Sequence, residues 1–375
     1  MTYKHAYLAP YRENFERLLD DKTFRIEIVH FSVSEDNPAI EEQHRAGVLP
    51  ILMRILYGKM QIKTGSKSTG AKHANMRKSI VLRFLAACQQ VELKTFIDLI
   101  FTPFHHFLSD DPFTKVKQLM RDIDYHAVIP LKRQISVLNT LDMIFSRLGA
   151  RIESYLPEMF QITICLASIC VQALEDRTKV APRYVNVLKN IRGLCLNRIL
   201  QFFTSFDKYP FTAADLDAVF EVAVWPQLPR IAFESAYNPS VLLKLFQLWS
   251  ENPRFHALLG KHHADNPGLT PLAYVFQLLS AKNVSAGVLG AVMGIVERLL
   301  AEEERSEEEE EEEEGSKLPP LEVNHCLDVN VAAKAAGFDV ATLGFGQPAR
   351  AGDGAHIRHQ SSTTFASSVE LDSRR

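Results

Sequence analysis

The chain has 375 residues, of which 46% are hydrophobic and 23% are charged. This composition excludes a wholly disordered chain, a collagen-like fibre and a small protein held together by disulfides. The formal net charge of −3 hides an asymmetry, because eleven glutamates lie within residues 301–314 and the rest of the chain is basic. A basic body beside an acidic run indicates surfaces that meet charged partners.

Residues 1–300 are predicted to form one amphipathic helix after another. Apolar side chains that recur at positions i, i+3, i+4 and i+7 share one helix face, which must be buried against another element. This spacing occurs in residues 49–60, 81–88, 97–104 and 141–148, and a longer helix is expected from Pro182 to Phe203. Pro50, Pro182 and Pro271 stand at the start of such segments, as is typical of the first helical turn.

Strict alternation of apolar and polar residues is nearly absent, and Phe24–Phe31 is the nearest example. We therefore expect about ten or eleven helices and no substantial sheet. The fold class is predicted to be all-α. The helices are expected to form either an α-solenoid of stacked helix pairs or a large irregular bundle.

Two segments interrupt the helical pattern. Residues 63–75 are rich in Gly, Ser, Thr and Lys and are predicted to be an exposed loop. Residues 301–317 are predicted to be an acidic low-complexity linker, because eight consecutive glutamates repel one another. Residues 318–375 are expected to be a mostly disordered tail, so the helical domain occupies residues 1–300.

The sequence contains no recognisable catalytic or metal-binding motif. Residues 65–72 resemble a phosphate-binding loop, but Ala71 follows the second glycine where that motif needs lysine. The cysteines and histidines lack zinc-ligand spacing, and four of the five cysteines lie in apolar helical patterns, which favours reduced thiols in the cytosol or nucleus. We predict no catalytic residue, cofactor, metal or small-molecule substrate. The first residues have no signal-peptide run, and the apolar windows at 159–173 and 286–300 are too short or interrupted for a membrane span, so no membrane partner is expected.

The strongest electrostatic feature is the basic block, residues 43–91, which contains no Asp or Glu. Such a segment attracts phosphate backbones or acidic proteins. Alternatively its charges keep the surface solvated, and the lack of interleaved aromatic residues favours this alternative over direct RNA contact. The candidate RNA or partner contacts are Arg54, Lys59, Lys63, Lys67, Lys72, Arg77, Lys78 and Arg83. A second basic group on one long helix is interpreted as ordinary surface charge: Arg183, Lys189, Arg192 and Arg198.

Several long strings resemble the DRIM ("down-regulated in metastasis") family, large helical-repeat proteins of the small-subunit processome. The strings cover roughly residues 10–300 in the order of the family. They are LLDDKTF (18–24), HRAGVLPILMRILYGKM (44–60), KTGSK (63–67), RFLAAC (83–88), LKNIRGL (188–194), AVWPQLPRIAFES (223–235), LLKLFQLWSENPRF (242–255) and SAKNVS (280–285).

The resemblance implies a non-enzymatic scaffold built of HEAT-like repeats in the nucleus and nucleolus. Such a scaffold supports processing of the 18S ribosomal RNA precursor and small-subunit assembly, with processome proteins and pre-ribosomal RNA as partners. Family members are several times longer, so the chain is expected to be one internal block: a fragment, an incomplete gene model or a truncated product. The alternative is a purely protein-binding helical-repeat adaptor of the transport-receptor or phosphatase-scaffold type.

Overall fold

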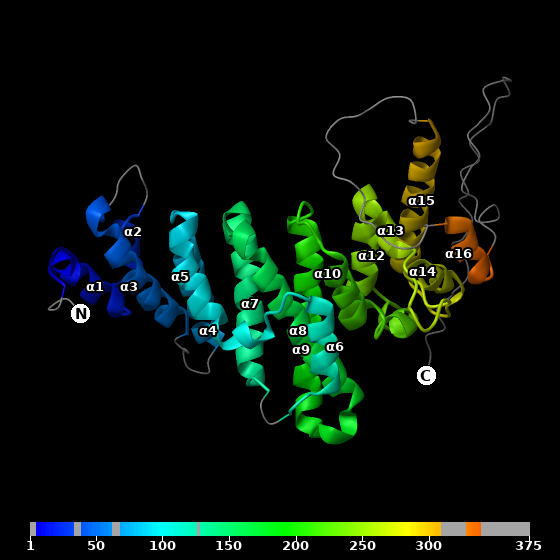
Figure 1. Ribbon diagram of the computed structural model, residues 1–375, viewed down its shortest axis with the longest axis horizontal. Coiled ribbons are helices and arrows are strands. Elements are labelled where there is room, and N and C mark those ends of the chain that lie inside the picture. Colours follow the sequence, from blue (N-terminus) through cyan, green and yellow to red (C-terminus); the bar gives the residue numbers. More distant parts are fainter. Residues whose placement is uncertain (1–4, 34–38, 62–67, 126–127, 309–327, 339–375) are drawn as a thin grey trace, which may run out of the picture.

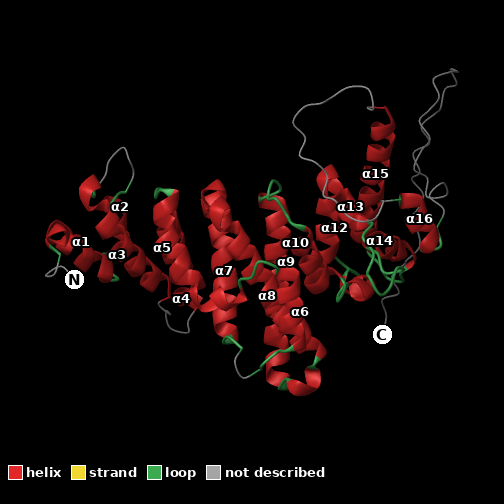
Figure 2. Ribbon diagram, viewed as in Figure 1, coloured by secondary structure: helices red, strands yellow, loops and turns green. Residues whose placement is uncertain are grey.

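A computed structural model of the chain describes residues 5–33, 39–61, 68–125, 128–308 and 328–338. Within these ranges every regular element is a helix, and the one β-bridge joins single residues, His263 and Asn266 (Figure 2). The prediction of an all-α chain is therefore confirmed. The α-helices are α1 (Arg12–Leu19), α2 (Phe24–His30), α3 (Glu42–Gln61), α4 (Ser68–Leu85), α5 (Gln90–Phe101), α6 (Pro112–Arg121), α7 (Leu131–Leu148), α8 (Leu156–Glu175), α9 (Pro182–Ser205), α10 (Ala213–Val219), α11 (Ile231–Glu234), α12 (Val241–Glu251), α13 (His256–Leu259), α14 (Pro271–Ser280), α15 (Ala286–Glu308) and α16 (Val329–Ala335).

The helices follow one another along the long axis of the molecule from α1 to α16, except that α6 lies beyond α7, where it packs on α8 and α10 (Figure 1). Contacts join near neighbours in the chain: α3 packs on α4 and α5, α4 on α7, and α7 and α8 on α9. Farther along, α12 packs on α9 and α15, and α14 packs on α15 and α16. The chain therefore forms an extended row of helices, and each part of the row is held mainly by the parts beside it.

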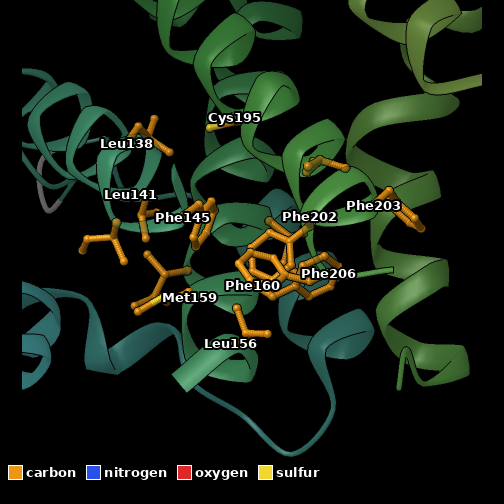
Figure 3. Packing of buried hydrophobic residues seen from close by; sticks show 14 of the residues in the cluster. Leu138, Leu141, Phe145, Leu156, Met159, Phe160, Cys195, Phe202, Phe203 and Phe206 are labelled. Carbon is orange, nitrogen blue, oxygen red and sulfur yellow. The ribbon is translucent and has the colours of Figure 1, made fainter. Parts of the chain in front are cut away.

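One hydrophobic cluster extends along the row from Leu8 to Ala333. Near its middle, where α7, α8 and α9 meet, aromatic rings from all three helices interlock (Figure 3). The ring centroid of Phe202 lies 4.9 Å from that of Phe145 and 5.0 Å from that of Phe160, both in edge-to-face geometry. Such pairs add to the free energy of apolar burial. The predicted long helix is confirmed as α9, and its predicted apolar face is buried.

The stretch Leu131–Glu175, which holds α7 and α8, contains a window with mean hydropathy 1.4 that is long and apolar enough to cross a membrane. In the structure 78% of that window is buried inside the protein. Neighbouring helices therefore cover its apolar side chains, as in the core helix of a folded domain.

Helix α3 begins earlier than the sequence predicts. Pro50 was expected in the first turn, yet it lies inside α3, which starts at Glu42. An interior proline removes one backbone hydrogen bond. The buried residues Arg45, Val48 and Leu49 continue the buried face of α3 across the proline, and tertiary packing of this kind outweighs the local preference.

The acidic linker begins later than predicted, because α15 continues to Glu308. Ala, Glu and Arg are strong helix formers, and extending an existing helix requires no new nucleation. Within the predicted tail, residues 328–338 pack on the row through α16, where Val329 is buried and the ring of Phe338 stacks on Phe276 of α14 at 6.4 Å. The rest of the predicted linker and tail lies outside the described residues.

Candidate RNA and partner interface

The basic block folds into α3, α4 and the start of α5. Its predicted loop, residues 63–75, is shorter than expected, because α4 begins at Ser68. Ser and Thr are favoured at helix starts, and after Gly70 the residues Ala71–Met76 include none that breaks a helix. Lys63 and Lys67 lie outside the described residues, and Lys72 is placed in α4 by its backbone alone.

Lys59 was predicted as a surface contact, but its side chain is only 5% exposed at the end of α3. Its ammonium group donates to the backbone carbonyl of Leu19 and to Oδ1 of Asp21, both at 2.5 Å. It also lies 5.5 Å from the ring centroid of Phe24. The hydrogen bond from Lys59 lowers the pKa of Asp21. The prediction that Lys59 is a surface contact is therefore corrected. Its side chain joins α3 to the turn between α1 and α2 and is not available to a partner.

Arg45, another cation of the basic block, is also buried and paired. Its Nε and Nη2 donate to the two carboxylate oxygens of Glu92 in α5, the second bond at 3.0 Å. This hydrogen bonding raises the pKa of Arg45. Glu92 Oε2 accepts in addition from the backbone N–H of Gln89 at 2.7 Å, which caps α5. The block contains no acids in its sequence, but in space it pairs with Asp21, which lies well before its first residue, and with Glu92, which directly follows its last.

Arg77 and Lys78 of α4 are half-buried. The Nη1 atom of Arg77 is shielded from solvent with no hydrogen-bond partner among the described residues, and its charge contributes to the lowered pKa of Asp21. Burial lowers the pKa of Lys78 from its ordinary value of 10.5. Both side chains therefore face neighbouring helices at least in part, which weakens the prediction that they are surface contacts. Arg54 of α3 and Arg83 of α4 are exposed, as predicted.

Replacing Lys78 with Met is expected to raise the free energy of unfolding at pH 7 by about 0.5 kcal/mol, because Met avoids the desolvation of a charge. Because burial lowers the pKa of Lys78, the unfolded chain binds this proton more tightly than the folded chain does. The contribution of Lys78 to the free energy of unfolding therefore becomes less unfavourable as pH rises toward 10.5. The advantage of Met should therefore shrink between pH 7 and pH 10 in urea denaturation. A Lys78→Met chain that is less stable at both pH values would contradict this.

The second basic group is largely structural. Arg192 of α9 pairs with Glu234 of α11 at 3.3 Å, and Arg198 forms an ion pair with Asp142 of α7. Arg183 lies 4.8 Å from the ring of its neighbour Tyr184, and Lys189 is exposed. Two of the four cations therefore join helices, and because Arg198 is buried, the interpretation of the group as ordinary surface charge is wrong for this residue.

Within the described residues no group of three or more His, Cys, Asp or Glu side chains could hold a metal ion. Cys88, Cys165, Cys170 and Cys195 are buried, and burial raises the pKa of the first three to about 12. Thiols of this kind are poor nucleophiles at neutral pH. These four thiols contribute to the apolar packing of the helices.

A family model for the N-terminal region of U3 small nucleolar RNA-associated protein 20 matches residues 1–330. The chain belongs to this family. The match confirms the resemblance that the sequence strings indicated.

Two curated relatives are both named U3 small nucleolar RNA-associated protein 20. The protein from Schizosaccharomyces pombe is 25% identical over 256 residues, which is 68% of this chain and 10% of the relative. The protein from Saccharomyces cerevisiae is 22% identical over 307 residues, which is 80% of this chain and 11% of the relative. The chain thus spans about a tenth of the length of the relatives it matches.

Proposed function

We propose that this chain is a non-enzymatic scaffold segment of the small-subunit processome. In this role it supports processing of the 18S ribosomal RNA precursor and assembly of the small ribosomal subunit in the nucleolus. It does so by binding processome proteins and precursor RNA along a HEAT-like α-solenoid. Family membership over residues 1–330 carries the proposal, because the relatives are named for their association with U3 small nucleolar RNA.

The architecture supports this role. A row of helices held by neighbour contacts offers a long surface, as repeat proteins do, and scaffolds use such surfaces to touch several partners at once. The exposed cation Arg54 lies on α3 and the exposed cation Arg83 lies near the end of α4, and in the sequence a lysine-rich segment joins these two helices. We include Lys63, Lys67 and Lys72 in the proposed contact surface with them, on the strength of the sequence.

The alternative is a purely protein-binding adaptor, in which the same cations meet an acidic partner. Ultraviolet cross-linking in a nuclear extract separates the two functions. RNA adducts on residues 54–83 support the scaffold that binds RNA, whereas protein adducts alone support the adaptor.

Charge reversal tests the contact surface. Changing Arg54, Lys63, Lys67, Lys72 and Arg83 together to Glu is expected to leave the helical circular dichroism unchanged, since surface substitutions rarely cost more than about 0.5 kcal/mol each. The same variant should sediment less with pre-ribosomal particles and lose salt-dependent affinity for structured precursor RNA. Arg77 and Lys78 are left intact, because Glu at a half-buried position would place a carboxylate between helices.

A matched control reverses five exposed cations elsewhere: Arg121, Lys132, Arg133, Arg147 and Lys208. Both variants lose the same net charge, so a purely non-specific attraction predicts equal loss of RNA binding. If both variants lose RNA affinity equally, the assignment of the RNA contact surface to α3 and α4 is wrong. Failure of the unaltered chain to sediment with pre-ribosomal particles would remove the proposed function itself.

A further inference from the structure

The two most exposed aromatic side chains of the described residues lie far from the basic block. Phe233 is 87% exposed and Tyr237 is 80% exposed, at and just after the end of α11. Burying a phenylalanine side chain contributes about 2 kcal/mol to the free energy of unfolding. A ring left in water does not make this contribution, whereas the buried rings of this protein do. An exposed ring of this kind therefore points to a binding role.

The backbone that carries these rings is held firmly in place. Glu234 of α11 is paired with Arg192 of α9, and Ser235 Oγ donates to Ser240 Oγ at 2.8 Å. On the other side, Ser285 donates from its backbone N–H to the carbonyl of Ala236 at 2.8 Å and from Oγ to the carbonyl of Tyr237 at 2.7 Å. The rings are thus presented on an ordered support, which lowers the entropy lost on binding.

The surroundings of the rings are basic. Three segments converge here through these bonds and through helix packing: α9, residues 222–250 and residues 266–296. Within these bounds the single acidic residue is Glu234, whose charge is met by Arg192, and the next acids stand at the ends of the segments: Glu221, Glu251, Asp265 and Glu297. Arg230, one turn before Phe233, and Lys282, three residues before Ser285, are both exposed. Two exposed aromatic residues and two exposed cations are thus carried by segments that these bonds hold together, and the carboxylate of Glu234 is paired with Arg192.

We propose that Phe233 and Tyr237 form a stacking site for single-stranded RNA, with Arg230 and Lys282 contacting its phosphates. Proteins bind single strands by stacking bases on aromatic rings beside cations, and this mode tolerates many sequences. Charge supports RNA as the ligand, because the segments that carry and hold the rings present two exposed cations, Arg230 and Lys282, which complement phosphates. The inference deepens the RNA-binding part of the proposed function and locates it on a surface separate from α3 and α4.

The test measures the affinity of the full chain for labelled uridine and adenosine oligonucleotides by fluorescence anisotropy. Phe233→Leu and Tyr237→Leu keep an apolar side chain but remove the flat ring, and each is expected to weaken binding about tenfold. Phe233→Trp and Tyr237→Phe preserve a ring and should bind within about twofold of the unaltered chain. The affinity for an RNA duplex, whose bases are already stacked, should be the same for all of these variants.

Unchanged single-strand affinity in the Leu variants would overturn the stacking site. Equal weakening by Leu and Trp would do the same, since it would show that side-chain shape matters and the ring does not. If the Leu variants keep RNA affinity but lose a processome protein that the unaltered chain retains, the surface binds protein and the inference fails. In each case the proposed scaffold role is judged separately, by sedimentation of the unaltered chain with pre-ribosomal particles.

Discussion

Replacing Arg45 with Met is expected to lower the free energy of unfolding by about 3 kcal/mol, because it breaks a buried ion pair from one side. The side chains of Arg45 and Glu92 are only 7% and 12% exposed, so the carboxylate left behind has little access to water. It keeps its bond from the Gln89 N–H but loses both bonds from the guanidinium. Urea denaturation followed by circular dichroism measures the loss.

The double variant Arg45→Met with Glu92→Gln provides the control for this ion pair. An amide at position 92 is neutral, yet its oxygen can still accept from the Gln89 N–H and cap α5. Most of the lost stability should therefore return in the double variant, because the unpaired buried charge is gone. A loss below about 1 kcal/mol in Arg45→Met alone would show that the pair behaves like one at the surface.

Arg45 and Lys59 also show why the order of charges along the sequence does not predict which charges are exposed in the folded protein. The basic block was identified by its lack of Asp and Glu, and that observation about the sequence is correct. Folding then brings Asp21 to Lys59 and Glu92 to Arg45, each partner lying outside the block. No periodicity or composition could have predicted these two pairings, because they depend on which helices meet.

The helices themselves were predictable from their apolar spacing, since an amphipathic face must be buried wherever it occurs. α9 follows the predicted segment closely, and the apolar residues that the spacing selects are buried, together with Leu196, Phe203 and the cation Arg198, which the spacing does not select. The boundaries were less predictable at Pro50, at Ser68 and beyond Ala301, because helices extend through residues of weak or opposing preference once their nucleus is packed.

The exposure of Phe233 and Tyr237 could not be predicted from the sequence either, because it also depends on how the helices pack. Phe233 falls within an apolar stretch that also contains Val222, Val224 and Ile231, and those three are buried. Only the packing of α11 separates the exposed ring from its buried neighbours. The one available signal was the near absence of acids around these residues, which the sequence shows only when three distant segments are considered together.

Replacing Phe202 with Ala is expected to cost about 4 kcal/mol of unfolding free energy and to lower the melting temperature by roughly 10 °C. Phe202 has no exposed surface, and its ring contacts those of Phe145 and Phe160 across three helices (Figure 3). Phe233→Ala is the matched control, since it removes the same atoms from an exposed position and should cost less than about 0.5 kcal/mol. Thermal unfolding followed by circular dichroism compares the two variants directly.

The pattern of unfolding in Phe202→Ala also tests the row itself. In an array held by neighbour contacts, a cavity at α9 weakens the centre and uncouples the helices on either side. Hydrogen exchange should then show protection lost first in α7, α8 and α9, while α3 with α5 and α14 with α15 keep more of theirs, because those pairs pack on each other. Uniform loss of protection over all helices would instead indicate a single cooperative bundle, and would contradict the solenoid that we propose.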